Sequence, residues 1–381
     1  MADWDSMFDG RLKTAGGLDE SQLDKVPPRR GVVLLSGQAQ PIVMITAANM
    51  RARVRSRLDR PADEKHRKVV NLREVTRRVW WKFAASAFEA DLCLVELARA
   101  IWPQTYASMV GWKPAWFVHV NPDGQFPHFV RGRKFPPPPV RSLGPFFRGR
   151  DAERFISSLQ DTFDLCRDYQ SLRRSPNAHR CSYAQMGRCL CPCDGTISMD
   201  EYVAAVGRAA DFAAGNRRGL AEQLGRRMQA ASDRLDFERA AGLKARLRRM
   251  TDFDRPVYAH VRPVEEFCFL VIQRGRGRRQ VRVFLCDRGA IGAVAVLKYP
   301  PPPADLRAVL DQIALYVSSC PAQDEAATLR MGLVSNYLFS GKARRGLIVR
   351  WTEDLDGGEL GERIAAAGNV LGLGGSAGGG R

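Results

Sequence analysis

The apolar positions near the N-terminus follow a strand pattern first and a helix pattern next. Two short apolar runs, 32–35 and 42–45, flank a polar linker and predict a β-hairpin. Asn49 is a typical N-cap residue, which predicts that a helix starts directly after it. The stretch 89–101 carries apolar residues at spacings of three and four, so we expect a helix with one face against the core. These elements predict a first folded domain over residues 31–105.

Residues 216–251 carry the clearest helical pattern of the chain. Apolar residues recur every three or four positions in two stretches, Leu220–Leu235 and Ala240–Met250. This pattern predicts two amphipathic helices joined by a tight turn, a helical hairpin. Two such helices expose apolar surface that they cannot bury alone, so a partner pair of helices is expected.

Between residues 252 and 352, apolar runs alternate with turn residues, and a helical pattern begins at Ala304. The runs are Val257–Val261, Phe267–Ile272, Val281–Cys286 and Ile291–Leu297. Runs of this length between turn residues predict a small, largely antiparallel sheet that packs with helices. We interpret this part as a structural α/β domain without chemistry of its own.

Together the patterns predict an α+β protein with several domains. The N-terminal residues are polar and lack periodicity, and the C-terminus ends in a glycine-rich sequence, so both are interpreted as tails. The predicted divisions are a tail at 1–30, an α/β domain at 31–105, a basic, proline-rich and cysteine-containing segment at 106–215, the helical hairpin at 216–251, a small α/β domain at 252–352 and a flexible tail at 353–381.

The charge balance favours a polyanionic partner. The 381 residues include 59 Lys and Arg against 41 Asp and Glu, a net charge of +18, and nucleic acid is the first such partner to consider. A segment without acidic residues holds the predicted DNA-binding residues Arg131, Arg133, Lys134, Arg141 and Arg148, and also Arg150. Four prolines at 136–139 argue against a helix in this segment, so we expect an extended basic strap along a phosphate backbone. A second basic cluster is expected at a hairpin tip and consists of Arg274, Arg276, Arg278 and Arg279.

A soluble protein of the cytoplasm is expected. No apolar run reaches the ~18 residues that a membrane span needs, and the N-terminus carries no apolar signal segment. The number of cysteines, nine, is odd, which argues against a framework of disulfides. Thiols in a reducing compartment remain available to bind metals.

Four cysteines carry the most specific chemical signal: Cys166, Cys181, Cys189 and Cys193. Several thiolates brought into one small volume hold a soft metal ion or an iron–sulfur cluster. Buried free cysteines are the alternative, but chance rarely places four within so short a stretch. We therefore expect a metal or cluster site, and tetrahedral zinc competes with an iron–sulfur cluster as its occupant.

The sequence around these cysteines resembles the UvrC family, the nuclease subunit of the bacterial UvrABC excinuclease. The resemblance lies in Arg180-Cys181, Gln185-Met186-Gly187-Arg188-Cys189 and Pro192-Cys193, with Gly144-Pro145-Phe146 upstream. In that family four cysteines ligate a [4Fe–4S] cluster, which implies the same role for Cys166, Cys181, Cys189 and Cys193. Cys191 is extra to the family pattern and is interpreted as a bystander.

The helical hairpin resembles the UVR motif of the same family. Its signature is Leu235-Asp236-Phe237-Glu238-Arg239-Ala240-Ala241, with Phe237 near the turn. In the family this hairpin docks on the matching hairpin of UvrB. The resemblance implies a UvrB-type partner, with contact residues Leu235, Phe237, Glu238 and Ala241.

The first domain resembles a degenerate GIY-YIG nuclease domain. Gly31-Val32-Val33 and Val43-Met44-Ile45-Thr46 stand where the family carries its two tyrosine-containing motifs, and both tyrosines are lost. Arg53 matches the catalytic arginine, Arg57 replaces a further tyrosine, and Glu96 matches the glutamate that binds a divalent metal. Cleavage of a phosphodiester needs an activated water, a metal and a group that takes a proton, and valine cannot take a proton.

These resemblances imply a UvrC-like nucleotide excision repair protein that binds DNA and a UvrB-type partner without strong nuclease activity. We find no counterpart in the sequence of the family's RNase H-like nuclease and helix-hairpin-helix motifs, so a truncated member is expected. The first alternative is a metal-dependent DNA endonuclease that uses Arg53 and Glu96 with Mg²⁺ or Mn²⁺. The second alternative is a redox sensor in which the iron–sulfur cluster reports and the hairpin relays the signal.

Overall fold

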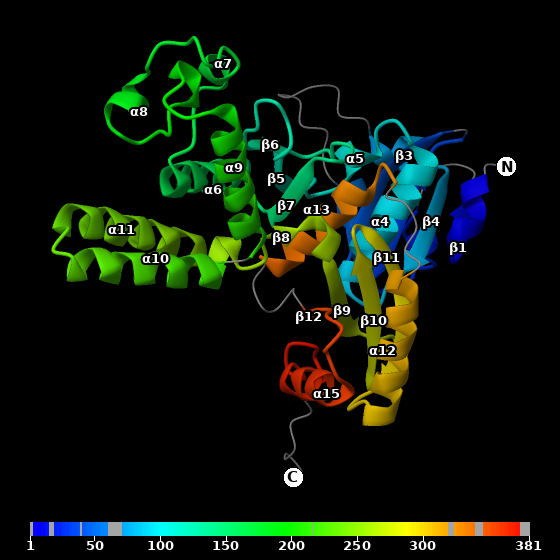
Figure 1. Cartoon of the computed structure of the whole chain (residues 1–381). Coiled ribbons are helices and arrows are strands. Elements are labelled where there is room, and N and C mark those ends of the chain that lie inside the picture. The colour runs from blue at the N-terminus through cyan, green and yellow to red at the C-terminus, as the bar shows by residue number, and fades with distance from the viewer. Residues whose placement is uncertain are drawn as a thin grey trace. The chain divides into compact units, whose positions relative to one another are not determined.

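The chain forms two compact units (Figure 1). The computed structural model describes residues 3–14, 19–38, 40–59, 71–215, 217–318, 324–339 and 346–373. The first unit joins Met1–Lys113 to Cys268–Arg381, and the second unit is Pro114–Phe267. Residues from the predicted domains at 31–105 and 252–352 therefore share one unit, because the chain returns to it after residue 267.

The first unit contains a four-stranded antiparallel sheet with the strand order β1-β4-β2-β3. Its strands are β1 (Gly10–Lys13), β2 (Gly31–Ser36), β3 (Pro41–Ala47) and β4 (Arg78–Phe83). β2 and β3 pair with Val33 opposite Ile45, which confirms the predicted hairpin. Every residue of β2 is buried, since helices cover both faces of the sheet.

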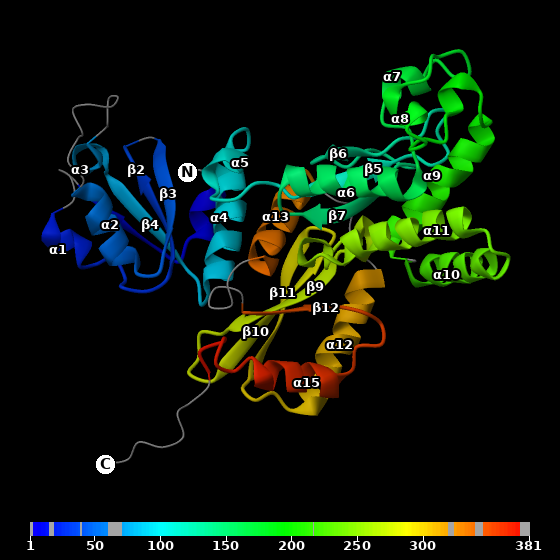
Figure 2. The same ribbon diagram turned by 90° about the vertical axis from the view of Figure 1, so that its left-hand side faces the viewer.

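The helices of this part lie on opposite faces of the sheet (Figure 2). One face carries α1 (Glu20–Leu23), α2 (Met50–Leu58) and α3 (Leu72–Val75), and the other carries α4 (Ala87–Ile101). Two further short helices of this part are η1 (Asp3–Met7) and α5 (Tyr106–Met109).

Two sequence predictions for these helices are confirmed. The Asn49 side chain accepts a hydrogen bond from the Ala52 amide at 3.0 Å and caps α2. α4 covers the helix predicted at 89–101, and its residues Leu94 and Leu97 are buried as the spacing predicts.

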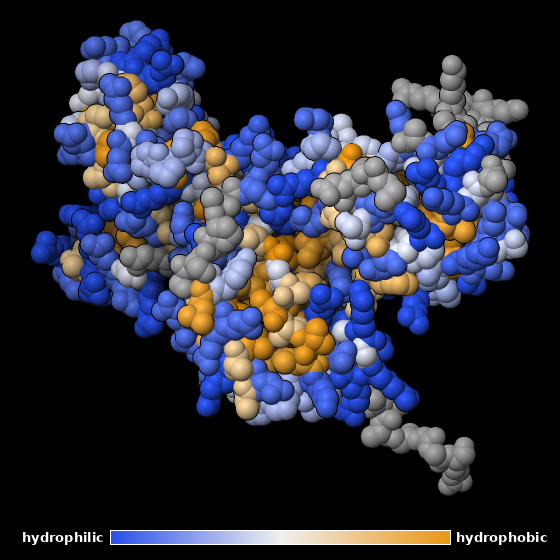
Figure 3. All heavy atoms as spheres, turned by 90° about the vertical axis from the view of Figure 1, so that its right-hand side faces the viewer, coloured by the Kyte–Doolittle hydropathy of each residue, from blue (hydrophilic) through white to orange (hydrophobic). Residues whose placement is uncertain are grey.

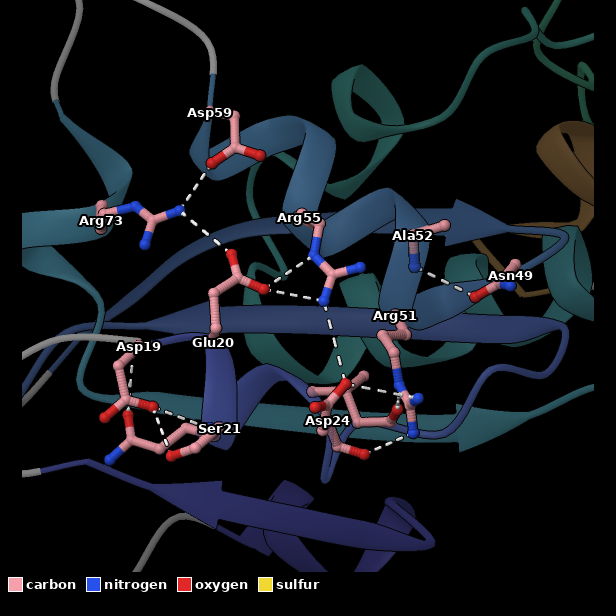
Figure 4. A network of polar contacts seen from close by, with 12 residues as sticks. Asp19, Glu20, Ser21, Asp24, Asn49, Arg51, Ala52, Arg55, Asp59 and Arg73 are labelled. Atoms are coloured by element: carbon pink, nitrogen blue, oxygen red, sulfur yellow. Dashed lines mark hydrogen bonds and ion pairs between the residues drawn. The ribbon is translucent and has the colours of Figure 1, made fainter.

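The N-terminal residues belong to the fold, so the prediction of a tail over 1–30 is wrong. β1 pairs with β4 along its whole length, and Leu23 is fully buried in the core beneath α2. Arg55 of α2 pairs with Glu20 of α1 at 2.8 Å, within a network of ion pairs that joins the two helices (Figure 4). Elements of four residues are too short to show periodicity, and the sequence pattern therefore missed them.

The rest of the first unit is built on a second antiparallel sheet with the strand order β11-β10-β9-β12. Its strands are β9 (Cys268–Arg274), β10 (Gln280–Asp287), β11 (Ala290–Lys298) and β12 (Leu347–Arg350). Three of the four predicted apolar runs are thus strands. The expected strand at Val257–Val261 is wrong, because Pro256 begins the 3-10 helix η4 (Pro256–Tyr258) and cannot donate to a strand ladder.

Three helices accompany this second sheet, namely α12 (Pro303–Ser318), α13 (Ala327–Leu338) and α15 (Gly357–Ala366). The prediction of a tail over 353–381 is corrected by α15, whose residues Leu360 and Ile364 are fully buried. Asp356 caps this helix by accepting a hydrogen bond from the Glu359 amide at 2.8 Å. The glycines of the sequence suggested flexibility, but a capped amphipathic helix can begin with two of them. Residues 374–381 lie outside the described residues.

Helix α13 joins the two parts of the first unit through contacts with α4 and with the loop after α5. The Trp112 indole Nε1 donates a hydrogen bond to the Leu329 carbonyl at 3.0 Å, and the Tyr337 hydroxyl donates to Asp91 at 2.9 Å. Periodicity within one segment says nothing about which distant surface it meets, so this union was not predicted.

The second unit is built on a sheet with the strand order β6-β5-β7-β8. Its strands are β5 (Trp116–Val120), β6 (Val130–Gly132), β7 (Arg141–Phe146) and β8 (Arg262–Pro263). Its helices are α6 (Gly149–Phe163), α7 (Tyr169–Leu172), α8 (Ser182–Gln185), α9 (Met199–Ala214), α10 (Arg217–Asp233) and α11 (Phe237–Met250). Its further 3-10 turns are η2 (Pro192–Asp194), η3 (Thr251–Asp254) and η5 (Val264–Glu266).

The predicted basic strap is corrected by this sheet. Arg131 and Arg141 lie on β6 and β7, and β5 lies between these strands. Arg150 lies in α6, which contradicts the exclusion of a helix from the whole segment. Proline restricts only its own residue and its near neighbours, so a helix can begin ten residues after the proline run.

An aromatic cluster holds the helices of the second unit together. Phe155 of α6 lies 5.1 Å, between ring centroids, from each of Phe146, Phe253 and Tyr258, all edge to face. Pairs of this kind contribute about 0.5–1.5 kcal/mol each beyond the burial of their area. The aromatic cluster therefore holds the segment after α11, which contains Phe253 and Tyr258, against α6.

The described helices include none that is long and apolar enough to cross a membrane. The face drawn in Figure 3 is largely hydrophilic, with apolar side chains gathered near its centre. Val296 on β11 and Leu315 on α12 are among the large apolar side chains that stay exposed in the first unit.

Candidate functional site in the cysteine segment and the helical hairpin

The four predicted cysteines lie on loops and short helices of the second unit. Cys166 follows α6, Cys181 is the N-cap residue of α8, Cys189 lies in the following loop, and Cys193 lies in η2. Cys166 and Cys193 are buried, whereas Cys181 and Cys189 are half-buried. The structure therefore brings residues from four separate elements to one region of the unit.

The thiols of these cysteines influence one another. The Cys189 thiol hydrogen-bonds to Cys166, which lowers the pKa of Cys166 and raises the pKa of Cys189. The charges of Cys193 and Cys181 act on Cys166 in the opposite direction and raise its pKa, but their effect is smaller than that of the hydrogen bond. The pKa of Cys193 is raised chiefly by burial and next by the charge of Cys189. Each of the four thiols thus lies within electrostatic range of at least two of the others.

Cys191 lies between the predicted ligands in an unusual backbone conformation. Its φ of 60° is in the left-handed region, and its amide donates a hydrogen bond to the Cys189 sulfur at 3.4 Å. Burial raises the pKa of the Cys191 thiol to about 11. A hydrogen bond from backbone to sulfur is a recognised way to tune a thiolate ligand.

The residue type suits a metal or cluster, because thiolates are ligands of zinc and of iron–sulfur clusters. Among the described residues, no three His, Cys, Asp or Glu side chains are grouped closely enough to hold a metal ion. Hydrogen bonds nevertheless fix the loops: the Tyr202 hydroxyl accepts from the Cys166 amide at 3.3 Å, and the Ala178 amide donates to the Cys193 carbonyl at 2.9 Å. These bonds hold the backbone on either side of the cysteines, whereas the four side chains do not form a ligand set among the described residues.

The predicted helical hairpin is confirmed as α10 and α11. Its base packs into the core of the second unit, where Leu224 and Met250 are buried. The expectation that the hairpin cannot bury its own apolar surface is therefore corrected for the base. The tip remains open, since Leu235 and Phe237 are 73% and 65% exposed.

The tip has a defined backbone. Leu235 has a φ of 61°, a left-handed conformation that residues with a Cβ rarely adopt. Asp236 then caps α11 by accepting a hydrogen bond from the Arg239 amide at 3.1 Å. The remaining predicted contact residues, Glu238 and Ala241, are exposed on the first turns of α11.

The hairpin and the cysteine segment are joined through the end of α6. Arg249 of α11 forms an ion pair with Asp164 at 3.6 Å, and the Leu190 amide, next to Cys189, donates to the Asp164 carbonyl at 2.8 Å. The guanidinium of Arg246 lies 5.3 Å from the centroid of the Phe163 ring. Sequence reasoning missed these residues, because arginines and aspartates more than 80 positions apart carry no signal of their contact.

Several predicted DNA-binding residues already have partners. Arg131 pairs with Glu153 at 2.6 Å, and Arg141 pairs with Asp211 at 2.9 Å. Arg133 stacks on the Trp116 ring, with 4.3 Å from its guanidinium carbon to the ring centroid. Among the residues that the structure describes, Lys134 and Arg148 are exposed and form no ion pair. These last two are the most available to a phosphate backbone.

The two predicted catalytic residues are not brought together by any described contact. Arg53 is exposed on α2, and Glu96 lies on α4, on the opposite face of the first sheet. The Glu96 carboxylate pairs with Arg330 of α13 at 3.1 Å. Val33, at the position of the first lost tyrosine, is fully buried in the core.

Comparisons with known proteins identify the same two regions. Residues 115–212 match the family of the UvrC/Cho excinuclease middle domain, and residues 219–250 match the UvrB/uvrC motif. UvrABC system protein C of Hyphomonas neptunium is 27% identical over 282 residues, which cover 71% of this chain and 44% of the relative. The protein of the same name from Caulobacter vibrioides is 26% identical over 289 residues, covering 71% and 42%.

A third relative, UvrABC system protein C of Rickettsia bellii, is 28% identical over 243 residues, covering 62% of this chain and 37% of the relative. The matched part is less than half the length of these curated relatives. No solved structure matches the chain. Two family matches that follow each other along the chain, and relatives that share one name, show that this chain is similar to UvrC proteins over these regions.

Proposed function

We infer that this protein acts in nucleotide excision repair as a UvrC-like component that binds DNA and a UvrB-type partner, holds a [4Fe–4S] cluster and has no strong nuclease activity. The observation that carries this inference is the hairpin, whose base is packed in the second unit while Leu235 and Phe237 at its tip face solvent. The match of residues 219–250 to the UvrB/uvrC motif supports the same partner.

The tip has the properties of a docking site. Exposed aromatic and aliphatic side chains on a rigid support lose little freedom on binding, so more of their burial appears as affinity. The ion pair of Arg249 and the burial of Met250 hold the base of α11 in place. A partner hairpin that covers Leu235 and Phe237 would remove this apolar surface from water.

Phe237→Ala is expected to weaken binding of a UvrB-type partner about 30-fold, since truncation of a central aromatic anchor costs roughly 2 kcal/mol. The fold should be unaffected because the side chain is 65% exposed. Titration calorimetry with the purified partner measures the affinity. Leu315→Ala is the matched control, because Leu315 is also an exposed apolar residue, on α12 of the other unit. Equal affinity of both variants would reject the docking site.

Cys166, Cys181, Cys189 and Cys193 are the residues that would hold the cluster. Bound there, the cluster supplies iron–sulfur bonds that cross-link the chain between α6 and η2. Asp164, at the end of α6, forms an ion pair with Arg249 of α11, so the hairpin is attached to the start of this cross-linked segment. We therefore assign the cluster a structural role, in which it stiffens the support of the hairpin.

Anaerobically purified protein is expected to contain iron and sulfide in equal amounts, with little zinc, as a [4Fe–4S] cluster requires. Cys181→Ser should lose the iron and lower the melting temperature of the second unit. Cys191→Ser is the matched control and should retain the iron, because Cys191 is proposed as a bystander. Iron-free and zinc-free protein that melts like the Cys181→Ser variant would contradict the proposal.

Weak nuclease activity is supported by three features of the first unit. Val33 stands where the family has a tyrosine, and its buried side chain cannot take a proton. The Glu96 carboxylate forms an ion pair with Arg330. Arg53 lies on the opposite face of the sheet from Glu96. Incubation with damaged and nicked duplexes, Mg²⁺ or Mn²⁺ and the partner tests this part. Cleavage that disappears in Glu96→Ala would instead favour the metal-dependent endonuclease.

A further inference from the structure

A basic cavity of about 510 Å³ opens in the first unit at one end of the sheet β1-β4-β2-β3. At this end β2 begins, β3 ends and β4 ends, since Gly31 lies opposite both Ala47 and Phe83. The connection into β2 contributes Arg29 and Arg30, the end of β9 contributes Arg274, and the turn between β9 and β10 contributes Arg276.

Four arginines are among the residues that line this cavity, and its lining includes no acidic residue. Within the described part of the chain, none of the four forms an ion pair, and the Arg276 side chain donates to the Phe83 carbonyl at 3.2 Å. The excess of positive charge is therefore local and uncompensated.

Two carboxylates that bond to the chain at Phe83 and Ala85, in the cavity wall, are already matched to cations. Asp9 accepts from the Phe83 amide and pairs with Lys82 at 3.2 Å. Glu89 accepts from the Ala85 amide at 2.7 Å and pairs with Arg282. Neither carboxylate is left over to neutralise the arginines of the cavity.

The backbone that carries the arginines is held in place. The Arg29 carbonyl accepts from the Met50 amide at 2.9 Å, and the Arg30 carbonyl accepts from the Ala84 amide at 3.1 Å. On the other side, the Gly275 amide donates to the Gln280 carbonyl at 2.7 Å, which closes the turn. A Cβ at Gly275 would lie 2.8 Å from the Gln280 Cβ, so this tight turn needs glycine.

We propose that this cavity binds the terminal phosphate of a nucleic acid strand. The planar guanidinium group of arginine matches the oxygens of phosphate and binds them in pairs. A terminal phosphate carries close to two negative charges, so it relieves the repulsion among four guanidinium groups better than an internal phosphodiester with one. The N-terminal end of α2, beside Ala48 in the cavity wall, adds a partial positive charge.

The proposal rests on the proposed function only in taking nucleic acid as the source of the phosphate. It concerns the first unit, whereas partner binding concerns the hairpin of the second unit. A protein that acts on incised DNA would meet strand ends, and a phosphate pocket would allow it to distinguish a phosphorylated end from a hydroxyl end.

The test uses the full chain and fluorescent DNA duplexes whose nick carries a 5′-phosphate, a 3′-phosphate or hydroxyl groups only. Fluorescence anisotropy is expected to show about tenfold tighter binding to one of the phosphorylated nicks than to the hydroxyl nick. The double variant Arg30→Gln and Arg276→Gln should lose this preference. Arg278→Gln is the control, since it removes a charge from the same turn without lining the cavity.

Equal binding of all three nicks by the unaltered protein would overturn the proposal, as would a preference that survives in the double variant. If that variant has a lowered melting temperature, Arg29→Gln with Arg274→Gln replaces it, since both side chains are exposed. Inorganic phosphate should compete only for the phosphorylated nick. If inorganic phosphate lowers DNA binding although the protein does not distinguish the three nicks, the cavity binds free phosphate, and the assignment to a strand end is overturned. The double variant should retain its affinity for the UvrB-type partner, which separates this outcome from failure of the proposed function.

Discussion

Glu96 illustrates how the neighbours of one side chain change the chemistry expected from its place in the sequence. Its match to a metal-binding glutamate predicts a ligand, but in the fold its carboxylate pairs with Arg330. Arg330 is itself largely buried and also pairs with Asp324 at 2.6 Å. Releasing Glu96 to a metal would leave a buried guanidinium with one partner fewer, which is costly. The tertiary contact thus favours a structural role for this residue.

Lowering the pH from about 7 to about 5.5 is expected to destabilise the second unit through His119. This ring is 3% exposed, and burial lowers its pKa below the usual value. The unfolded chain therefore takes up a proton near pH 6.5 that the folded chain does not, so stability is lost as the pH falls through this value. Urea denaturation at the two pH values measures the effect.

His119→Gln should reduce this pH dependence, whereas His179→Gln should leave it unchanged, because His179 is exposed. His119 also hydrogen-bonds through Nδ1 to the Ser142 hydroxyl at 2.8 Å, and a glutamine amide can keep one such bond. Identical pH dependence in the unaltered protein and the His119 variant would assign the effect to other groups.

The helical hairpin combines a packed base with an exposed tip. Its two helices share a base in the core of the second unit, and Arg249 ties α11 to the end of α6 beside the cysteine segment. The turn gathers the features that cost stability, namely a left-handed non-glycine residue and two exposed apolar side chains. Strain and exposed apolar surface at one place are common where a binding surface is preserved.

Leu235→Gly is expected to stabilise the hairpin by about 0.5–1 kcal/mol, because glycine adopts a φ of +61° without the steric cost of a Cβ. The same change should weaken partner binding, since it removes an exposed apolar side chain. Leu235→Ala is the matched control, because it removes the side chain and keeps the strain. Thermal denaturation and partner titration separate the two effects, and equal stability of both variants would show that the turn is not strained.

Over the whole molecule the positive charge is spread through both units, so that no single segment accounts for it. Some basic residues of the predicted strap are neutralised by acidic partners, as Arg141 is by Asp211. Others, such as Lys134 and Arg148, and the arginines of the first-unit cavity, have no ion pair within the described residues. Nucleic acid affinity should follow this second group, because a paired arginine must first give up its carboxylate.

DNA affinity is expected to fall steeply with salt, since each phosphate contact releases a condensed counterion. Arg148→Gln should reduce the slope of log K against log salt by about one. Arg141→Gln should change it less, because Asp211 already occupies this arginine. Anisotropy titrations over a range of salt concentrations give the slopes. A flat dependence, or equal slopes for the two variants, would remove the strap residues from the interface.

Local pattern was sufficient where neighbouring residues decide the structure. The Asn49 cap, the hairpin of β2 and β3, and the helices α10 and α11 all depend on spacings within a few turns or strands, and all were predicted. The cysteine motif was equally local, which is why four thiols could be selected from nine cysteines before any fold was known.

The tertiary structure alone decided which of these parts meet. β1 reaches the core through the half-buried Leu12, and α15 through Leu360 and Ile364, in elements too short or too rich in glycine to predict. The cavity with Arg29 and Arg276 joins positions almost 250 residues apart, and the pair of Arg249 with Asp164 joins positions 85 apart. Sequence periodicity reports which side of an element is apolar, but only packing determines which surface covers it. Contacts at long range, and the charge that they neutralise or leave free, therefore came from the fold.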